Sequence, residues 1–105
     1  MTLRALIIHP DDNVANLIGP GRKGQAVECS VEGRQDKTTI TLADDIPANH
    51  KLARADVRAG SAIVKYGLSI GKASCDIRQG QHVHVHNIES SRGRGDLVSP
   101  GRAST

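Results

Sequence analysis

Hydrophobic residues occur in this chain as short runs that end at glycine, proline or aspartate, and this pattern predicts short β-strands. The alternating residues 25–31 and the β-branched residues 38–42 show it best, and we expect them to form a hairpin. The expected strands span residues 2–8, 25–31, 38–42, 61–66, 72–77 and 82–88.

The segments between these runs are less regular. Val14–Ile18 follows three side chains that can cap a helix, so we expect a short turn or helix there. Leu52–Val57 is expected to form one helical turn or a bridging strand, and Ser69–Gly71 a tight turn. We identify no internal repeat. The whole pattern favours a mostly β fold, a compact barrel or clip with short strands and little helix.

Composition limits what such a fold can bury. A chain of 105 residues forms one small domain with a modest core, which a partner surface could support. Tyr66 is the only aromatic residue, so the core must consist of Ile, Val, Leu and Ala. Cys29 and Cys75 lack the Cys-x-x-Cys spacing of metal and redox sites, and we expect both to be reduced core residues.

Charge and hydropathy exclude several classes of function. The formal net charge is +3, but the basic residues are dispersed and stacking aromatic residues are absent, which argues against a nucleic-acid partner. No apolar run approaches the roughly 20 residues of a membrane span, and no signal peptide opens the chain. We therefore expect a cytoplasmic protein with no membrane association.

The most distinctive local pattern is the alternation of histidine and valine near the end of the chain. His82, His84 and His86 alternate with Val83 and Val85, which in a strand places the imidazoles on one face and the valines toward the core. Such histidines are about 6.7 Å apart along the strand. Two of them could converge on a metal ion with a third ligand from elsewhere. An exposed histidine face without a ligand is an equally open interpretation.

Other candidates occupy strand ends and loops. His9 and the neighbouring Asp12 could act as a base or as metal ligands, although one of Asp11 and Asp12 is better explained as a cap for the next turn. Lys65 could pair with a substrate carboxylate and Tyr66 could donate its hydroxyl, although such pairs are commonly plain surface residues.

Four ordered motifs resemble the N-terminal domain of the altronate/galactarate dehydratase family. They are His9-Pro10-Asp11-Asp12-Asn13-Val14-Ala15, Asp45-Ile46-Pro47-Ala48-Asn49-His50-Lys51, Val64-Lys65-Tyr66-Gly67 with Ile70-Gly71, and His82-Val83-His84-Val85-His86-Asn87. Asn49 departs from the family pattern, which has glycine before the His-Lys pair.

The resemblance implies a SAF-type β-clip over residues 1–88, followed by a polar Ser/Arg/Gly tail or linker over residues 89–105. It also implies that the chain is the small subunit of a hydro-lyase, inactive alone, whose site is completed by a large catalytic subunit. Formation of a homo-oligomer stays open.

The reaction implied is a β-elimination on a small sugar acid, assisted by a divalent metal, Fe²⁺ or Mn²⁺, held mainly by the large subunit. The resemblance implies catalytic roles for His9, Asp12, His50, His84 and His86, with His84 and His86 as metal ligands and Lys65, Tyr66 and Asn87 as substrate-binding residues. The base is expected on the partner. Two alternatives are the α subunit of a sulfolactate sulfo-lyase and a non-catalytic SAF module that binds carbohydrate or protein.

Overall fold

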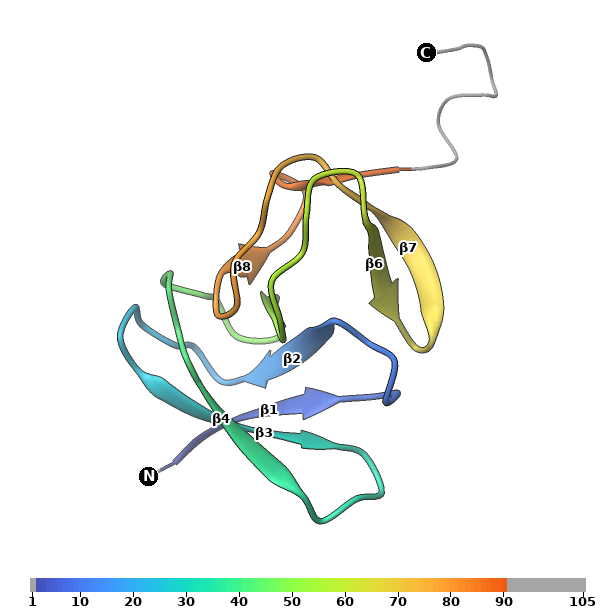
Figure 1. Cartoon of the computed structure of the whole chain (residues 1–105). Coiled ribbons are helices and arrows are strands. Elements are labelled where there is room, and N and C mark those ends of the chain that lie inside the picture. Colours follow the sequence, from blue (N-terminus) through green and yellow to red (C-terminus); the bar gives the residue numbers. More distant parts are fainter. Residues whose placement is uncertain (1, 91–105) are drawn as a thin grey trace, which may run out of the picture.

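The computed structural model describes residues 2–90, and these residues contain nine β-strands and no helix (Figure 1). The predicted tail over residues 89–105 therefore falls almost entirely outside the described residues. The strands are β1 (Leu3–Ile7), β2 (Val14–Ile18), β3 (Ala26–Val31), β4 (Lys37–Thr41), β5 (Lys51–Ala53), β6 (Ala62–Lys65), β7 (Leu68–Ala73), β8 (His82–Val83) and β9 (Ile88–Glu89). The mostly β prediction is confirmed. No helix in the described part of the chain has the length and apolarity needed to cross a membrane.

The strands form two curled sheets. The larger sheet has the order β4-β3-β1-β2-β5-β8, and the smaller sheet has the order β6-β7-β9. All neighbouring strands are antiparallel except β1 and β3, which pair in parallel. Strands β1 to β4 make the lower half of the molecule in Figure 1, and β6, β7 and β8 make the upper half.

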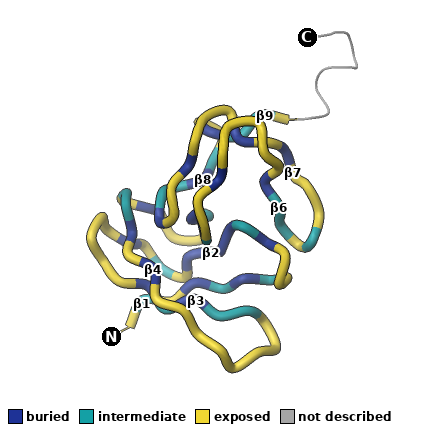
Figure 2. Tube along the Cα trace, in the orientation of Figure 1, coloured by how far each residue is buried: buried dark blue, intermediate teal, exposed yellow. Residues whose placement is uncertain are grey.

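Each half has its own aliphatic core, visible as the buried segments of Figure 2. The lower core is built from Ala5, Ile7, Ala15, Leu17, Val27, Cys29, Ile40, Leu42, Ile46 and Leu52. The upper core is built from Val14, Ala53, Val57, Ile63, Ala73, Ile77 and Val83. Strands β2 and β5 contribute to both, because Val14 and Ala53 face the upper core whereas Leu17 and Leu52 face the lower one. These two paired strands therefore join the halves.

Three local predictions are wrong. Val14–Ile18 is strand β2, since β1 and β5 pair with its two edges and supply the hydrogen bonds that a short helix would have made internally. Ser69–Gly71 belongs to strand β7, and the hairpin turn lies earlier, at Tyr66-Gly67. Cys75 is exposed rather than buried.

Cys29 fits its predicted place in the core. Its side chain is buried, and this burial raises the pKa of the Cys29 thiol to about 11, with a smaller opposing effect of Arg54. A protonated, enclosed thiol is a poor nucleophile, so Cys29 acts as a small apolar residue.

The loop between β1 and β2 holds the smaller sheet against the larger one. The buried carboxylate of Asp12 accepts three backbone hydrogen bonds, from His9 N at 3.1 Å, Tyr66 N at 3.1 Å and Gly67 N at 2.8 Å. The Asn13 side chain accepts from Val64 N and donates to Ala62 O, as a neighbouring strand would. Both side chains thus fasten β6 and its turn to the end of β2.

The hydrogen bonds of Asp12 stabilise Tyr66, whose backbone has a left-handed conformation. Tyr66 has φ +58° and Gly67 has φ +73°, and together they form the two-residue turn of the β6–β7 hairpin. A bulky side chain disfavours this conformation by about 1–2 kcal/mol. Two hydrogen bonds to a buried carboxylate offset that cost.

A second device is a β-turn that recurs four times in segments that pair with one another, apart from the turn Val31–Arg34 between β3 and β4, which has the same hydrogen bond and a left-handed Gly33. In each turn the fourth residue donates its N–H to the carbonyl of the first, as in Gln25 to Arg22, His50 to Pro47, Ser61 to Arg58 and Gln81 to Arg78. The third residue of each turn has positive φ, and these residues are Gly24, Asn49, Gly60 and Gly80. A left-handed third residue is typical of type II turns, where glycine or asparagine fits best. Asn49 therefore keeps the backbone that the family glycine would have.

Aspartates lock these turns together in pairs. Asp45 accepts a hydrogen bond from Lys23 N, Asp56 from Gln79 N and Asp76 from Ala59 N. Isolated bridges between Gly21 and Ile46 and between Val57 and Ile77 complete the two pairs. The structure thus contains a short repeat, Asp, aliphatic residue, type II turn, that we did not identify in the sequence.

The first prediction concerns the Asp12 carboxylate. Asp12→Asn keeps the shape but removes the charge and one acceptor, so we expect a loss of about 2–4 kcal/mol in the free energy of unfolding, measured by urea denaturation. Asp11→Asn is the matched control, since the Asp11 side chain is 80% exposed, and it should change stability by less than about 0.5 kcal/mol. Equal stability of the two variants would contradict the role assigned to Asp12.

The second prediction compares two turn glycines. Gly60 and Gly80 have φ +87° and +89°, but a Cβ meets nothing within 4 Å at Gly60, whereas at Gly80 it overlaps the Thr41 carbonyl oxygen. Gly60→Ala should cost about 1–2 kcal/mol from backbone strain alone, and Gly80→Ala about 3–5 kcal/mol. Thermal denaturation of both variants measures the difference. Similar values would show that the close approach between Gly80 and Thr41 is easily relieved.

Candidate functional site

Four of the five histidines gather where β5 and β8 pair. His50 is the last residue of its type II turn and directly precedes β5, while His82 opens β8 opposite Leu52. His50 Nδ1 lies 2.9 Å from His82 Nε2, which is a hydrogen-bond distance. The ring centroid of His84 lies 4.4 Å from that of His50, and that of His86 lies 5.2 Å from that of His82. We call His50, His82, His84 and His86 the histidine cluster.

The segment that carries this cluster is not the regular strand that the alternation predicts. Strand β8 ends at Val83, and the chain then turns back into β9. Val83 is fully buried as predicted, but Val85 is 81% exposed, so only the first valine reaches the core. The His82 and His84 rings stack with an interplanar angle of 8°, which shows that these two side chains still lie on one side of the segment.

Backbone hydrogen bonds fix the position of this turn. Asp44 accepts from His82 N at 2.9 Å. The buried side chain of Asn87 accepts from His84 N at 3.0 Å and donates to His82 O at 2.9 Å. Asn87 was predicted to bind substrate. In the structure both polar atoms of its amide contact the backbone of the histidine segment, so Asn87 positions His82 and His84.

The surroundings of the cluster favour neutral imidazoles. Partial burial and then the charge of His50 lower the pKa of His82, while Asp44 opposes the shift. Burial, His50 and Lys51 lower the pKa of His84 in that order. These shifts favour the neutral form of both rings, and a neutral imidazole has one nitrogen that can accept a proton or bind a metal ion.

Three of these rings meet the basic geometric requirement of a metal site. One ring nitrogen each from His50, His82 and His84 can be chosen so that all lie within 4.8 Å of one another. His86 is not in this group. The predicted ligand pair, His84 and His86, thus shares one member with the group that the structure brings together. Sequence reasoning recognised His82 as part of the alternating face but did not assign it a role.

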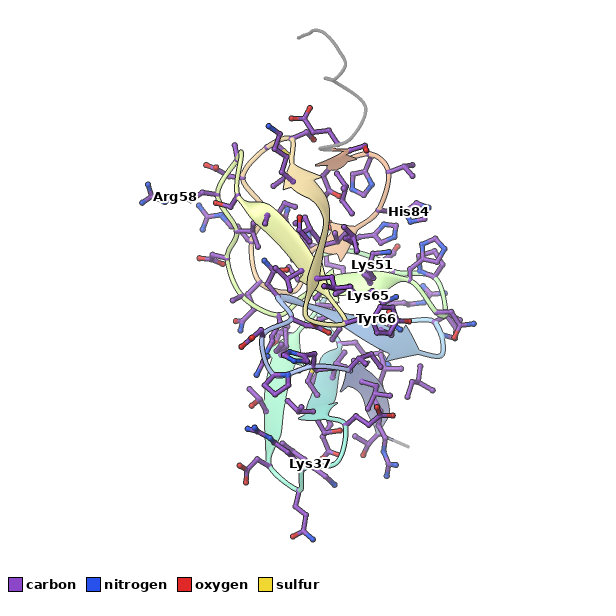
Figure 3. All side chains as sticks on the ribbon, turned by 90° about the vertical axis from the view of Figure 1, so that its right-hand side faces the viewer. Lys37, Lys51, Arg58, Lys65, Tyr66 and His84 are labelled. Carbon is purple, nitrogen blue, oxygen red and sulfur yellow. The ribbon has the colours of Figure 1, made fainter. Side chains whose placement is uncertain are left out.

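Two lysines and the tyrosine continue from the cluster across the same side of the molecule (Figure 3). His84, Lys51, Lys65 and Tyr66 follow one another down this side, which we call the cationic face. Lys65 Nζ lies 5.0 Å from the centre of the Tyr66 ring, within the range of a cation–π contact. Burial and then the charge of Lys65 lower the pKa of Lys51, so the two ammonium groups act on each other.

Asn16 adds a polar group near Lys51. The two residues are directly opposite in the register of β2 and β5, so their side chains share one face of the sheet. Asn16 Oδ1 is buried and has no hydrogen-bond partner among the described residues. An unsatisfied buried acceptor is rare and suggests that a donor from outside completes it. The sequence analysis assigned no site role to Lys51 or to Asn16.

His9 and Asp12 both lie beside the Tyr66-Gly67 turn of the β6–β7 hairpin. A Cβ on Gly67 would be 3.0 Å from the His9 ring, so glycine is required for this close approach. His9 Nδ1 accepts a hydrogen bond from Asp11 N, which leaves Nε2 as the free ring nitrogen. Asp12 is enclosed by three N–H donors, which come from His9 and from the Tyr66-Gly67 turn and not from the segment after Asp12 that the predicted cap would have bound. His9 makes no ring contact with the histidine cluster in the part of the chain that the structure describes.

Comparison with known proteins places this arrangement in a family. Residues 3–91 match the family described as the altronate/galactarate dehydratase SAF domain. The altronate dehydratase of Escherichia coli is 42% identical over 84 residues, which are 80% of this chain and 16% of that protein. The altronate dehydratase of Bacillus subtilis is 37% identical over 84 residues, which are again 80% of this chain and 16% of that protein. This chain thus spans about a sixth of the length of these two relatives.

A shorter relative matches along its whole length. The (2R)-sulfolactate sulfo-lyase subunit alpha of Chromohalobacter salexigens is 33% identical over 93 residues, which are 88% of this chain and 99% of that protein. Since the family match covers all but the first of the described residues, the chain belongs to the altronate/galactarate dehydratase SAF-domain family.

Proposed function

We propose that this chain is the small subunit of a hydro-lyase that dehydrates a sugar acid such as altronate, and that a large partner chain completes the site. The family and the altronate dehydratase relatives support the reaction class. The relative named as a subunit, matched over 99% of its length, supports a function in a complex.

One observation carries the proposal, namely that neutral imidazoles and two ammonium groups share the cationic face. A sugar acid presents a carboxylate and several hydroxyl groups. Lys51 and Lys65 attract the carboxylate. An imidazole that is not bound to a metal can donate the proton that a departing hydroxide needs.

The histidines take different parts in this proposal. His50 and His84 belong to the group that could hold a metal ion, while the exposed His86 lies outside that group and is the member of the cluster that donates a proton to the leaving group. His9, beside the Tyr66 turn, faces the opposite end of the substrate. Asp12 acts by holding the turn that presents Lys65 and Tyr66. The base that removes the proton next to the carboxylate belongs to the partner.

A divalent metal would stabilise the negative charge that develops when that proton leaves. His50, His82 and His84 fit such an ion as donors, because imidazole nitrogen suits Fe²⁺ and other late transition metals. Mn²⁺ prefers carboxylate and carbonyl oxygen, so this group fits iron better than manganese.

A second candidate is the α subunit of a sulfolactate sulfo-lyase, in which sulfite leaves instead of water. The near full-length match to the subunit of Chromohalobacter salexigens favours it. Both reactions remove a proton next to a carboxylate and expel a group from the next carbon, so both would use the cationic face in the same way.

The third prediction identifies the reaction. The chain, combined with its large partner chain and Fe²⁺ or Mn²⁺, should convert altronate to an α-keto acid, detected by a carbonyl reagent, and the chain alone should show no turnover. Galactarate and (2R)-sulfolactate are tested in parallel, with release of sulfite as the sign of the second candidate. Full activity of the partner without this chain would overturn the catalytic role and favour a docking module.

The fourth prediction tests the cationic face. Lys65→Ala should raise KM about tenfold with a smaller change in kcat, because a charge-assisted contact of about 1.4 kcal/mol to the substrate is lost. Lys37→Ala is the matched control, since Lys37 lies at the far end of the molecule and pairs with Glu28 (Figure 3). Identical KM values for the two variants would argue against substrate binding by Lys65.

A further inference from the structure

We propose that His50, His82 and His84 form a transition-metal site that is complete within this chain and fills before any partner binds. This deepens the proposed function, in which these three histidines are suitable donors to an ion, because it places the whole site on this chain, whereas the family resemblance implies a metal held mainly by the large subunit. The observation is that three imidazole nitrogens from two separate segments lie within 4.8 Å of one another.

The spacing of these nitrogens is close to that of a bound metal. Nitrogens at about 2.0–2.1 Å from a tetrahedral ion are roughly 3.3 Å apart. His50 Nδ1 and His82 Nε2 are already 2.9 Å apart, and the His84 ring stacks on His50 at a centroid distance of 4.4 Å. Binding of one ion requires the side chains to rotate so that nitrogens within 4.8 Å of one another come closer together.

The backbones that carry these rings are fixed independently of any metal. His50 closes a type II turn, and its carbonyl accepts from Leu17 N at 2.9 Å. Asp44 and Asn87 together bind the backbone of the histidine segment at His82 N, His82 O and His84 N. Little backbone ordering is then needed on binding, which is the condition under which a three-ligand surface site becomes strong.

The donor set defines the class of metal. Three neutral nitrogen ligands favour Zn²⁺, Cu²⁺, Ni²⁺, Co²⁺ and Fe²⁺ and disfavour Mg²⁺ and Ca²⁺, which require oxygen. Three protein ligands leave at least one coordination position open, as in catalytic zinc sites.

His86 provides an internal control. Its ring lies 5.2 Å from that of His82, yet the residue is exposed and outside the group whose nitrogens converge. A nonspecific histidine patch would use His86 as readily as His84. A built site would use His84 and not His86.

The fifth prediction is a Co²⁺ titration of the full chain, prepared without a polyhistidine tag and followed by visible absorption. We expect saturable binding of one Co²⁺ per chain, displacement by Zn²⁺ and no competition from Mg²⁺. His84→Ala and His50→Ala should each weaken binding at least tenfold, whereas His86→Ala and His9→Ala should change it less than about threefold.

Thermal denaturation provides a second measurement. Zn²⁺ should raise the Tm of the wild-type chain and of His86→Ala but not that of His84→Ala, since an ion that binds only the folded chain stabilises it. Circular dichroism without metal checks that each variant is folded. Absence of binding by the wild-type chain, or equal losses in His84→Ala and His86→Ala, would overturn the proposal. Neither outcome depends on turnover, so a failure of the metal-site proposal can be distinguished from a failure of the lyase assay.

Discussion

The buried carboxylate of Asp12 is the constraint on which the arrangement of this molecule depends. The two aliphatic cores meet through β2 and β5, and the smaller sheet packs on the larger one through the upper core, in which Ile63 and Ala73 lie with Val14, Ala53 and Val83. This apolar packing does not by itself fix the direction of the β6–β7 turn. Asp12 accepts hydrogen bonds from Tyr66 and Gly67, and the adjacent Asn13 pairs with β6. These bonds set where Lys65 and Tyr66 lie relative to Lys51 on β5. The geometry of the cationic face therefore follows from a loop that makes no direct contribution to its charge.

The repeated type II turn places the other half of the site. Its fourth position is Gln25, His50, Ser61 or Gln81, so the same backbone unit carries a histidine in only one of its four copies. The residue after the turn is Lys51 in one copy and His82 in another, and these two residues lie on adjacent, paired strands. Convergence of His50 on His82 is thus a consequence of two equivalent turns leading into neighbouring strands. Two copies of the same type II turn thus place polar side chains at the paired starts of β5 and β8.

The sequence predicted features that depend on neighbours along the chain and missed those that depend on distant pairing. The alternation from His82 to His86 correctly placed Val83 in the core. The cap of the next turn expected of Asp11 or Asp12 is not formed, because Asp12 accepts from His9 N and from the distant Tyr66 N and Gly67 N. Val14–Ile18 failed as a turn or helix because two distant strands flank it. Lys51 and Asn16 carried no local signal, since their importance arises from a register between β2 and β5. The turn repeat was hidden because only aspartate, one aliphatic residue and one left-handed residue recur.

The exposure of the site explains why such a small chain would need a partner. Tyr66 is 57% exposed, His86 is exposed, and the rings of His50 and His84 are only partly covered. In contact with water, an ammonium group 4 Å from a carboxylate contributes about 1 kcal/mol, whereas the same pair near a protein surface of lower effective dielectric contributes about 4 kcal/mol. A surface that covers the cationic face would therefore strengthen its hold on an anionic substrate and exclude water from a developing carbanion. In the complex that we propose, this chain would supply fixed polar groups on one wall of the site, and a second wall from the partner would enclose the substrate against them.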